Sequence, residues 1–197
     1  VVKPSNIFNA LVPVALTMRP TSKAILLYAP LSVFLLSVAR KGLWCRLWCR
    51  ELLEGQIADG IVELGFEPSD YFRQTDLQIA AVGWLAQQKL FHDIARKVGA
   101  ERIATLDSER LTSNPGEALA AAVSHFGLGG HAAANAAHPA FATHSKFGGS
   151  FRTEDRRAEY ELAQMAHGDE IEKVLIWAEA VAQSANIPLT LEHALRF

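Results

Sequence analysis

The sequence contains little cysteine and no strong excess of either charge. Only Cys45 and Cys49 occur in 197 residues, too few for the disulfide scaffold of a small secreted protein. The formal net charge is −2 at pH 7, which argues against a general nucleic-acid-binding protein, because such a domain is usually strongly basic. The low cysteine content favours a reducing, cytoplasmic setting.

The sequence also lacks a hydrophobic run long enough to cross a membrane. The apolar stretch 24–39 carries no charge between Lys23 and Arg40. It is shorter than the roughly 20 residues that a transmembrane helix needs, and Pro30 interrupts it. We interpret this stretch as a buried strand, a turn and a buried helix, and we expect no stable membrane insertion.

A third absence concerns phosphate binding. The sequence has no G-x-x-x-x-G-K-[ST] loop, in which backbone N–H groups surround a phosphate. The chain opens with Val1-Val2-Lys3-Pro4 instead of methionine, a pattern typical of the end of a strand. We therefore expect a further part of the protein to precede this sequence.

Short strands alternate with amphipathic helices along the chain. Continuous apolar runs predict parallel strands at 24–29 and 102–106. A strand that leads through a tight turn into a helix is the repeating unit of a doubly wound sheet. The pattern predicts one α/β domain over 1–197, with helices on both faces of a short parallel sheet. Helical spacing predicts helices at about 4–18, 32–54, 69–98, 114–127 and 154–185, with a long loop at 127–150.

Four stretches carry a resemblance to the sulfotransferase family of P-loop proteins. VVKPSN at 1–6 resembles the family's strand ending in Lys-Thr-His or Lys-Thr-Pro. AILLYAPLSVFLLS at 24–37 resembles its strand, Arg-Asp-Pro turn and serine-bearing helix. RIATLDSERLTSNPGEAL at 102–119, with His-Phe-Gly at 125–127, resembles its later strand and helix. HSKFGGSFR at 144–152 is similar to the glycine-containing loop that closes over the nucleotide.

The resemblance implies a fold and a reaction. The fold is a three-layer P-loop-type parallel sheet flanked by helices, whose first strand and phosphate loop would lie N-terminal to this sequence. The reaction transfers a sulfuryl group from 3′-phosphoadenosine 5′-phosphosulfate to a hydroxyl or amine of a small-molecule acceptor, without a metal. This chain departs from the family's pattern at three places. Tyr28 and Ala29 stand where the family has arginine and aspartate, and Ser5 or Asn6 stands where it often has a catalytic histidine.

The resemblance also assigns roles to individual residues. Lys3 would neutralise charge that develops on the bridging oxygen, and Ser5 would lie at the catalytic position. Ser37 would donate a hydrogen bond to the 3′-phosphate of the donor. Arg40, three residues later, would supply the charge that Tyr28 lacks. The late loop would bind the donor through Ser145, Lys146, Gly148, Gly149 and Arg152.

Two other functions fit the same sequence. One is a different P-loop activity, such as a nucleotide-dependent kinase or other transferase. The other is a non-catalytic binding module of the same fold, which the departures at Tyr28 and Ala29 favour. The sequence identifies neither the acceptor nor the oligomeric state.

The remaining polar and aromatic residues have simpler interpretations. We expect one or both cysteines to be buried and to bind no metal, because a lone C-x-x-x-C lacks a second ligand pair. We expect Asp107 and Glu109 to cap the next element and to pair with Arg110 or another cation. The tryptophans at 44, 48, 84 and 177 would lie in the core or in the wall of an acceptor pocket.

Overall fold

The computed structural model describes residues 1–128 and 153–197. Within them the chain forms a helix-rich α/β structure around two parallel strands, β1 (Ala24–Tyr28) and β2 (Ile103–Asp107). Ala24 lies opposite Ile103 and Tyr28 opposite Asp107. Both strands fall where the apolar runs predict them, and their parallel pairing is confirmed.

Nine helical segments surround the strands in the described part of the chain. Thr75 begins the longest of the early helices through a capping box, in which its hydroxyl accepts from the Gln78 N–H and its own N–H donates to the Gln78 side chain. The segments are η1 (Asn6–Leu11), α1 (Val12–Met18), α2 (Leu31–Arg40), α3 (Gly42–Ala58), η2 (Asp70–Arg73), α4 (Asp76–Val98), α5 (Ser108–Ser113), α6 (Pro115–Phe126) and α7 (Thr153–Ser184).

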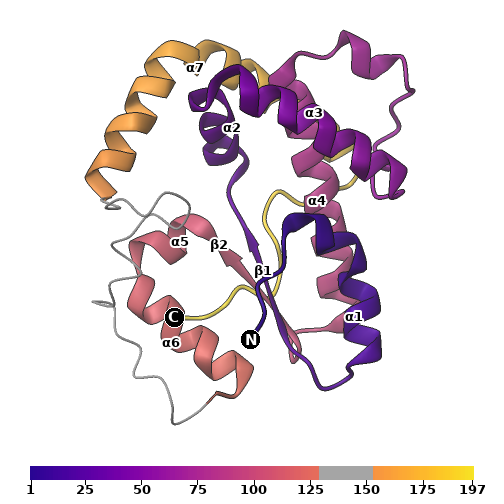
Figure 1. The fold of residues 1–197 in the computed structure, drawn as a ribbon, viewed down its shortest axis with the longest axis vertical. Coiled ribbons are helices and arrows are strands. Elements are labelled where there is room, and N and C mark those ends of the chain that lie inside the picture. The colour runs from indigo at the N-terminus through magenta and orange to yellow at the C-terminus, as the bar shows by residue number, and fades with distance from the viewer. Residues whose placement is uncertain (129–152) are drawn as a thin grey trace.

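Helices cover both faces of the two strands (Figure 1). Leu26 and Ile103 pack with Phe91 of α4 and with α1. The alternate strand residues Ala104 and Leu106 face the other way and pack against α6. This alternation follows from the pleat, since successive side chains of a strand point to opposite faces. The C-terminal segment also lies beside β2, where the Thr105 N–H donates to the His193 carbonyl at 2.9 Å.

The largest core cluster lies beyond the carboxyl ends of the strands. It joins α2, α3, α4 and α7, as Figure 1 shows in the upper half of the view. Its fully buried members include Leu35, Leu77 and Leu85. Ile171 and Ala178 lie on one face of α7 and connect this helix to the cluster. Within the described ranges, no helix is long and apolar enough to span a membrane.

Three predictions about local structure are wrong. The helix expected over 69–98 begins only at Asp76, because Thr75 adopts an extended conformation and caps it, and the 3-10 segment η2 precedes this break. The helix expected over 32–54 is divided into α2 and α3, because Gly42 adopts a left-handed φ of +71° after the turn at Lys41. The strand end expected at Val1-Val2-Lys3 is not formed, and these residues are exposed. A strand requires a ladder partner for its backbone groups, and no described residue pairs with this segment.

Candidate functional site

A cavity of about 270 Å³ lies at the carboxyl end of β1. Residues of η1, the β1–α2 turn, α2, α3 and α4 line it. In parallel α/β sheets, ligands bind outside the carboxyl ends of the strands. The cavity is slightly smaller than the roughly 300–1,000 Å³ of a pocket for a drug-sized ligand.

One face of α4 forms a wall of the cavity. The indole Nε1–H of Trp84 donates to the carbonyl oxygen of Ala29 at 2.9 Å. This bond connects α4 to the turn that follows β1, and Trp84 is only 7% exposed. The lining residues of α4 recur at helical spacing, namely Ala80, Gly83, Trp84, Gln87, Gln88 and Phe91.

The opposite wall comes from α2 and α3. Ser37 of α2 and Lys41, the residue that follows the end of α2, both line the cavity. Cys45 and Cys49 are buried and free, as the sequence predicts for at least one of them. Burial raises the pKa of Cys49 to about 12, so this thiol stays protonated near neutral pH and is a poor nucleophile.

The polar groups of the cavity are mainly side-chain amides. The Gln56 Nε2 donates to the Gly83 carbonyl oxygen at 3.3 Å, and the Asn9 Nδ2 donates to the Gln87 Oε1 at 2.6 Å. These two bonds leave the Gln56 Oε1 and the Gln87 Nε2 buried without a hydrogen-bond partner. Gln88 is satisfied, because its Nε2 donates to the Leu189 carbonyl at 3.1 Å.

The orientation of the Gln56 amide follows from its partner. A main-chain carbonyl can only accept, so the Gln56 nitrogen must face Gly83 and its oxygen must be the unpaired atom. An ideal Cβ added at Gly83 would lie 3.1 Å from this oxygen. The absent side chain at Gly83 therefore leaves the space that the Gln56 amide occupies.

The structure brings together some of the residues that the resemblance singles out. Ser37, Tyr28 and Ala29 all line the cavity, and so does Asn6. Ser5 is adjacent to Asn6, and its hydroxyl donates to the Asn6 Oδ1 at 3.1 Å. Burial raises the pKa of Tyr28 above its ordinary value, against the opposing effect of a hydrogen bond with the Leu191 backbone.

Other predicted site residues lie elsewhere. Lys3 is exposed and does not line the cavity. Arg40 does not line it either, because its guanidinium points to α7 and forms an ion pair with Glu159. The predicted donor loop lies outside the described residues; its members are Ser145, Lys146, Gly148, Gly149 and Arg152. Most of the loop expected at 127–150 also lies outside the described residues.

Sequence reasoning missed several of the cavity's polar residues. Lys41 could have been found from its i+4 spacing to Ser37 on a predicted helix. Gln87 and Gln88 could have been noticed as polar residues between Trp84 and Phe91 on an otherwise apolar face. Gln56 left no such signal, since its contact with Gly83 depends on how α3 packs against α4.

The four tryptophans lie in three kinds of environment: the cavity wall, a partly buried packing position and the exposed surface. Trp84 and Trp48 line the cavity. Trp177 is partly buried and stacks on Phe66, with ring centroids 6.0 Å apart. Trp44 is 70% exposed and stacks on Trp48, so the prediction that it lies in the core or in a pocket wall is wrong.

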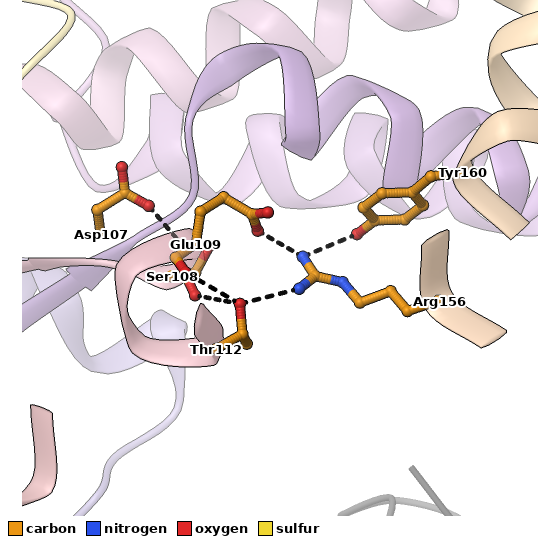
Figure 2. Close-up of polar contacts among 6 residues, drawn as sticks. All are labelled: Asp107, Ser108, Glu109, Thr112, Arg156 and Tyr160. Atoms are coloured by element: carbon orange, nitrogen blue, oxygen red, sulfur yellow. Dashed lines mark hydrogen bonds and ion pairs between the residues drawn. The ribbon is translucent and has the colours of Figure 1, made fainter. Parts of the chain in front are cut away.

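A second polar cluster lies at the carboxyl end of β2 (Figure 2). The Asp107 carboxylate accepts from the Glu109 N–H at 2.7 Å and caps α5. The Arg156 guanidinium donates to the Glu109 Oε1 at 2.5 Å and to the Thr112 Oγ1 at 3.1 Å. Burial disfavours the charge on Arg156, yet hydrogen bonds with Tyr160 and Glu109 raise its pKa. The prediction that Asp107 caps and Glu109 pairs with a cation is confirmed, and this cluster joins α5 to α7.

The cavity is a better candidate site than the polar cluster at the carboxyl end of β2, because it offers space for a ligand as well as unpaired polar atoms. Its described lining contains one charged side chain, Lys41, and no aspartate, glutamate or histidine. It can therefore attract an anion through Lys41, and Tyr28 and Lys41 are the titratable oxygen and nitrogen groups of its described lining. No family model, curated protein or solved structure matches this chain.

Proposed function

We propose that this chain carries the acceptor side and part of the donor side of a sulfotransferase-like enzyme. The donor would be 3′-phosphoadenosine 5′-phosphosulfate, and the acceptor a small molecule with a hydroxyl or amine. The fold would be a P-loop-type sheet in three layers, of which β1 and β2 are two neighbouring strands.

One observation carries this proposal. The resemblance assigns the catalytic position to Ser5 or Asn6, the donor positions of the strand end to Tyr28 and Ala29, and the 3′-phosphate contact to Ser37. Tyr28, Ala29 and Ser37 belong to one strand–turn–helix unit, and Asn6 comes from η1; all four line one cavity at the carboxyl end of β1. This common position supports the proposal.

The cavity's electrostatics support an anionic donor at its mouth. Lys41 is exposed and lines the same cavity as the half-buried Ser37. Its ammonium would replace the charge that the arginine position, here Tyr28, cannot supply. A cavity of about 270 Å³ is too small for a whole nucleotide, so the nucleotide would lie outside it with its 3′-phosphate near Ser37 and Lys41.

The transfer itself requires positioning and charge stabilisation more than covalent chemistry from the protein. The acceptor oxygen forms a bond to sulfur while the bond between sulfur and the 5′-phosphate oxygen breaks. That electron pair leaves with adenosine 3′,5′-bisphosphate, and the acceptor's proton passes to water. Lys3 would stabilise the charge on the leaving oxygen, and Lys146 and Arg152 of the late loop would bind the donor phosphates.

Equilibrium binding of adenosine 3′,5′-bisphosphate tests the proposal. At 100 times its dissociation constant a ligand that binds only the folded state adds about 2.7 kcal/mol. This corresponds to an increase in melting temperature of about 5–10 °C for a chain of this size. Ser37→Ala and Lys41→Ala should weaken the binding about tenfold each, whereas Arg40→Ala, on the same helix but outside the cavity, should leave it unchanged.

The controls separate the proposal from its rivals. Stabilisation by ATP with magnesium, and none by the bisphosphate, would favour the kinase-like alternative. Bisphosphate binding that Arg40→Ala weakens and Lys41→Ala does not would place the phosphate on the wrong side of α2 and contradict this site. Binding of the bisphosphate by the whole protein without any sulfuryl transfer would favour a binding module.

A further inference from the structure

Cys45 and Cys49 form a pair of free thiols in the wall of the cavity. They lie four residues apart on α3, and positions four apart are neighbours on one helix face. Both are buried, at 3% and 6% exposure, and both line the cavity. The proposed sulfuryl transfer assigns no role to either thiol.

The two thiols interact with each other. A side-chain hydrogen bond joins Cys49 to Cys45 and is one cause, after burial, of the raised pKa of Cys49. Cysteine sulfur is only a weak donor and a weak acceptor. The proton between the two sulfurs is therefore held weakly by its acceptor, and a metal ion that bonds to both sulfurs would gain more.

The spacing of the pair suits a bridging ion better than a disulfide. A disulfide requires Cβ atoms about 3.5–4.5 Å apart, whereas the Cβ atoms of positions four apart on a helix are about 5–6 Å apart. With metal–sulfur bonds of about 2.3 Å, an ion in line between two sulfurs holds them about 4.6 Å apart. The α3 backbone can therefore remain helical while the pair binds such an ion.

The surroundings of the pair favour a soft ion with few ligands. Thiolates favour Cu(I) and zinc. Zinc takes at least three protein ligands, and the described cavity lining adds no histidine, aspartate or glutamate to the two sulfurs. In the part of the chain that the structure describes, no three or more such residues form a metal-binding group. Cu(I) has a filled d shell and is stable between two thiolates in a linear arrangement.

The charge balance also suits a monovalent cation. Binding replaces two thiol protons with one Cu(I), so the site gains a single negative charge and the two protons pass to water. The ammonium of Lys41 lines the same cavity and favours negative charge at Cys49. Burial makes a bare thiolate costly, but this cost falls when a bound cation takes up most of the thiolate charge.

We propose that Cys45 and Cys49 bind one Cu(I) ion as a two-coordinate bis-thiolate. The ion reaches the sulfurs through the cavity and stays reduced, because two sulfurs without nitrogen or oxygen ligands do not suit Cu(II). This binding is independent of the proposed sulfuryl transfer.

Titration of the reduced protein in the absence of oxygen tests the proposal. Cu(I) is supplied as its coloured bicinchoninate complex, and the loss of colour reports transfer to the protein. We expect transfer of one Cu(I) per chain, with a new ultraviolet band from sulfur-to-copper charge transfer. Binding should release about two protons per ion. Zinc at the same concentration should not compete.

Single variants test whether both sulfurs are ligands. Cys45→Ala and Cys49→Ala each leave one thiol, so each should lose the transfer from bicinchoninate. Leu43→Ala, at a 67% exposed position of the same helix, should take up Cu(I) as the wild type does. Circular dichroism of each variant reports whether its helices are intact.

X-ray absorption of the copper-loaded wild type requires no variant. We expect two sulfur neighbours per copper and no second copper nearby. Nitrogen or oxygen neighbours, or a third sulfur from another chain, would overturn the proposal. So would the absence of transfer from bicinchoninate, or full transfer to either single variant. Uptake of one copper between two sulfurs in a protein that binds no adenosine 3′,5′-bisphosphate would uphold this inference and reject the proposed function.

Discussion

The break between α2 and α3 leads us to expect opposite changes in the free energy of unfolding when either of two glycines, Gly42 or Gly55, is replaced by alanine. Gly42 has a φ of +71°, and an added Cβ would meet no heavy atom within 4 Å. Any cost of Gly42→Ala therefore comes from backbone conformation alone. Gly55 lies inside α3, is exposed, and also has open space around an added Cβ.

The expected magnitudes follow from these conformations. A left-handed backbone costs an L-residue about 1–2 kcal/mol, and alanine recovers about 0.4–1 kcal/mol of this by restricting the unfolded chain. Gly42→Ala should therefore lower the free energy of unfolding by about 1 kcal/mol. Gly55→Ala should raise it by about 0.5–1 kcal/mol, because alanine is the better helix former.

Urea denaturation followed by circular dichroism measures both changes. The two variants should differ by about 2 kcal/mol, or about 4–8 °C in melting temperature. Gly42→Asn should lose less stability than Gly42→Ala, because asparagine adopts the left-handed conformation more readily. If Gly42→Ala instead stabilises the protein as much as Gly55→Ala, α2 and α3 form one continuous helix and the described cavity wall is wrong.

Two further predictions concern buried groups near the cavity. Trp84→Phe removes the hydrogen bond to the Ala29 carbonyl and leaves unfilled space. It should therefore lower the free energy of unfolding in urea by about 2–3 kcal/mol. Trp44→Phe, at a 70% exposed position, should lower it by less than about 0.5 kcal/mol. Equal costs would show that the indole bond contributes nothing. Burial raises the pKa of Cys49 from 9.0 to about 12, so the unfolded chain loses this proton first as the pH rises. The contribution of Cys49 to stability is complete below pH 9 and is lost toward pH 12. Between these values the wild type should lose up to about 1.4 kcal/mol per pH unit relative to Cys49→Ala. A difference that does not change with pH would contradict the raised pKa.

The parts of the fold that the sequence predicts are those with a strong local pattern. The runs at 24–29 and 102–106 are too short for helices and rich in strand-forming residues, and strands form at 24–28 and 103–107. The helical period of α4 and α7 is similarly local. The break at Gly42 was not predicted because the apolar pattern continues across it, and a single glycine is a weak signal within such a pattern.

The candidate site was only partly predictable because the cavity is a property of several elements together. Ser37 was identified from a motif, and its position at the carboxyl end of β1 follows from the order of strand and helix. The choice of Arg40 as its companion rested on spacing alone. At Lys41 the chain turns, so that Lys41 lines the cavity, whereas Arg40 forms its ion pair with Glu159 on α7. That partner is 119 residues away in sequence, beyond the reach of any local pattern.

The unpaired amide atoms of Gln56 and Gln87 also affect the stability of the protein. A buried polar atom without a partner costs about 1–3 kcal/mol, so Gln56 and Gln87 lower stability in the unliganded protein. The Gly83 carbonyl lies inside α4 and keeps a helical partner even if the Gln56 side chain is replaced. Gln56→Met should therefore leave the free energy of unfolding unchanged or raise it, as urea denaturation would show. A variant that lost stability would instead mean that the bond from the Gln56 Nε2 to the Gly83 carbonyl outweighs the cost of the unpaired oxygen.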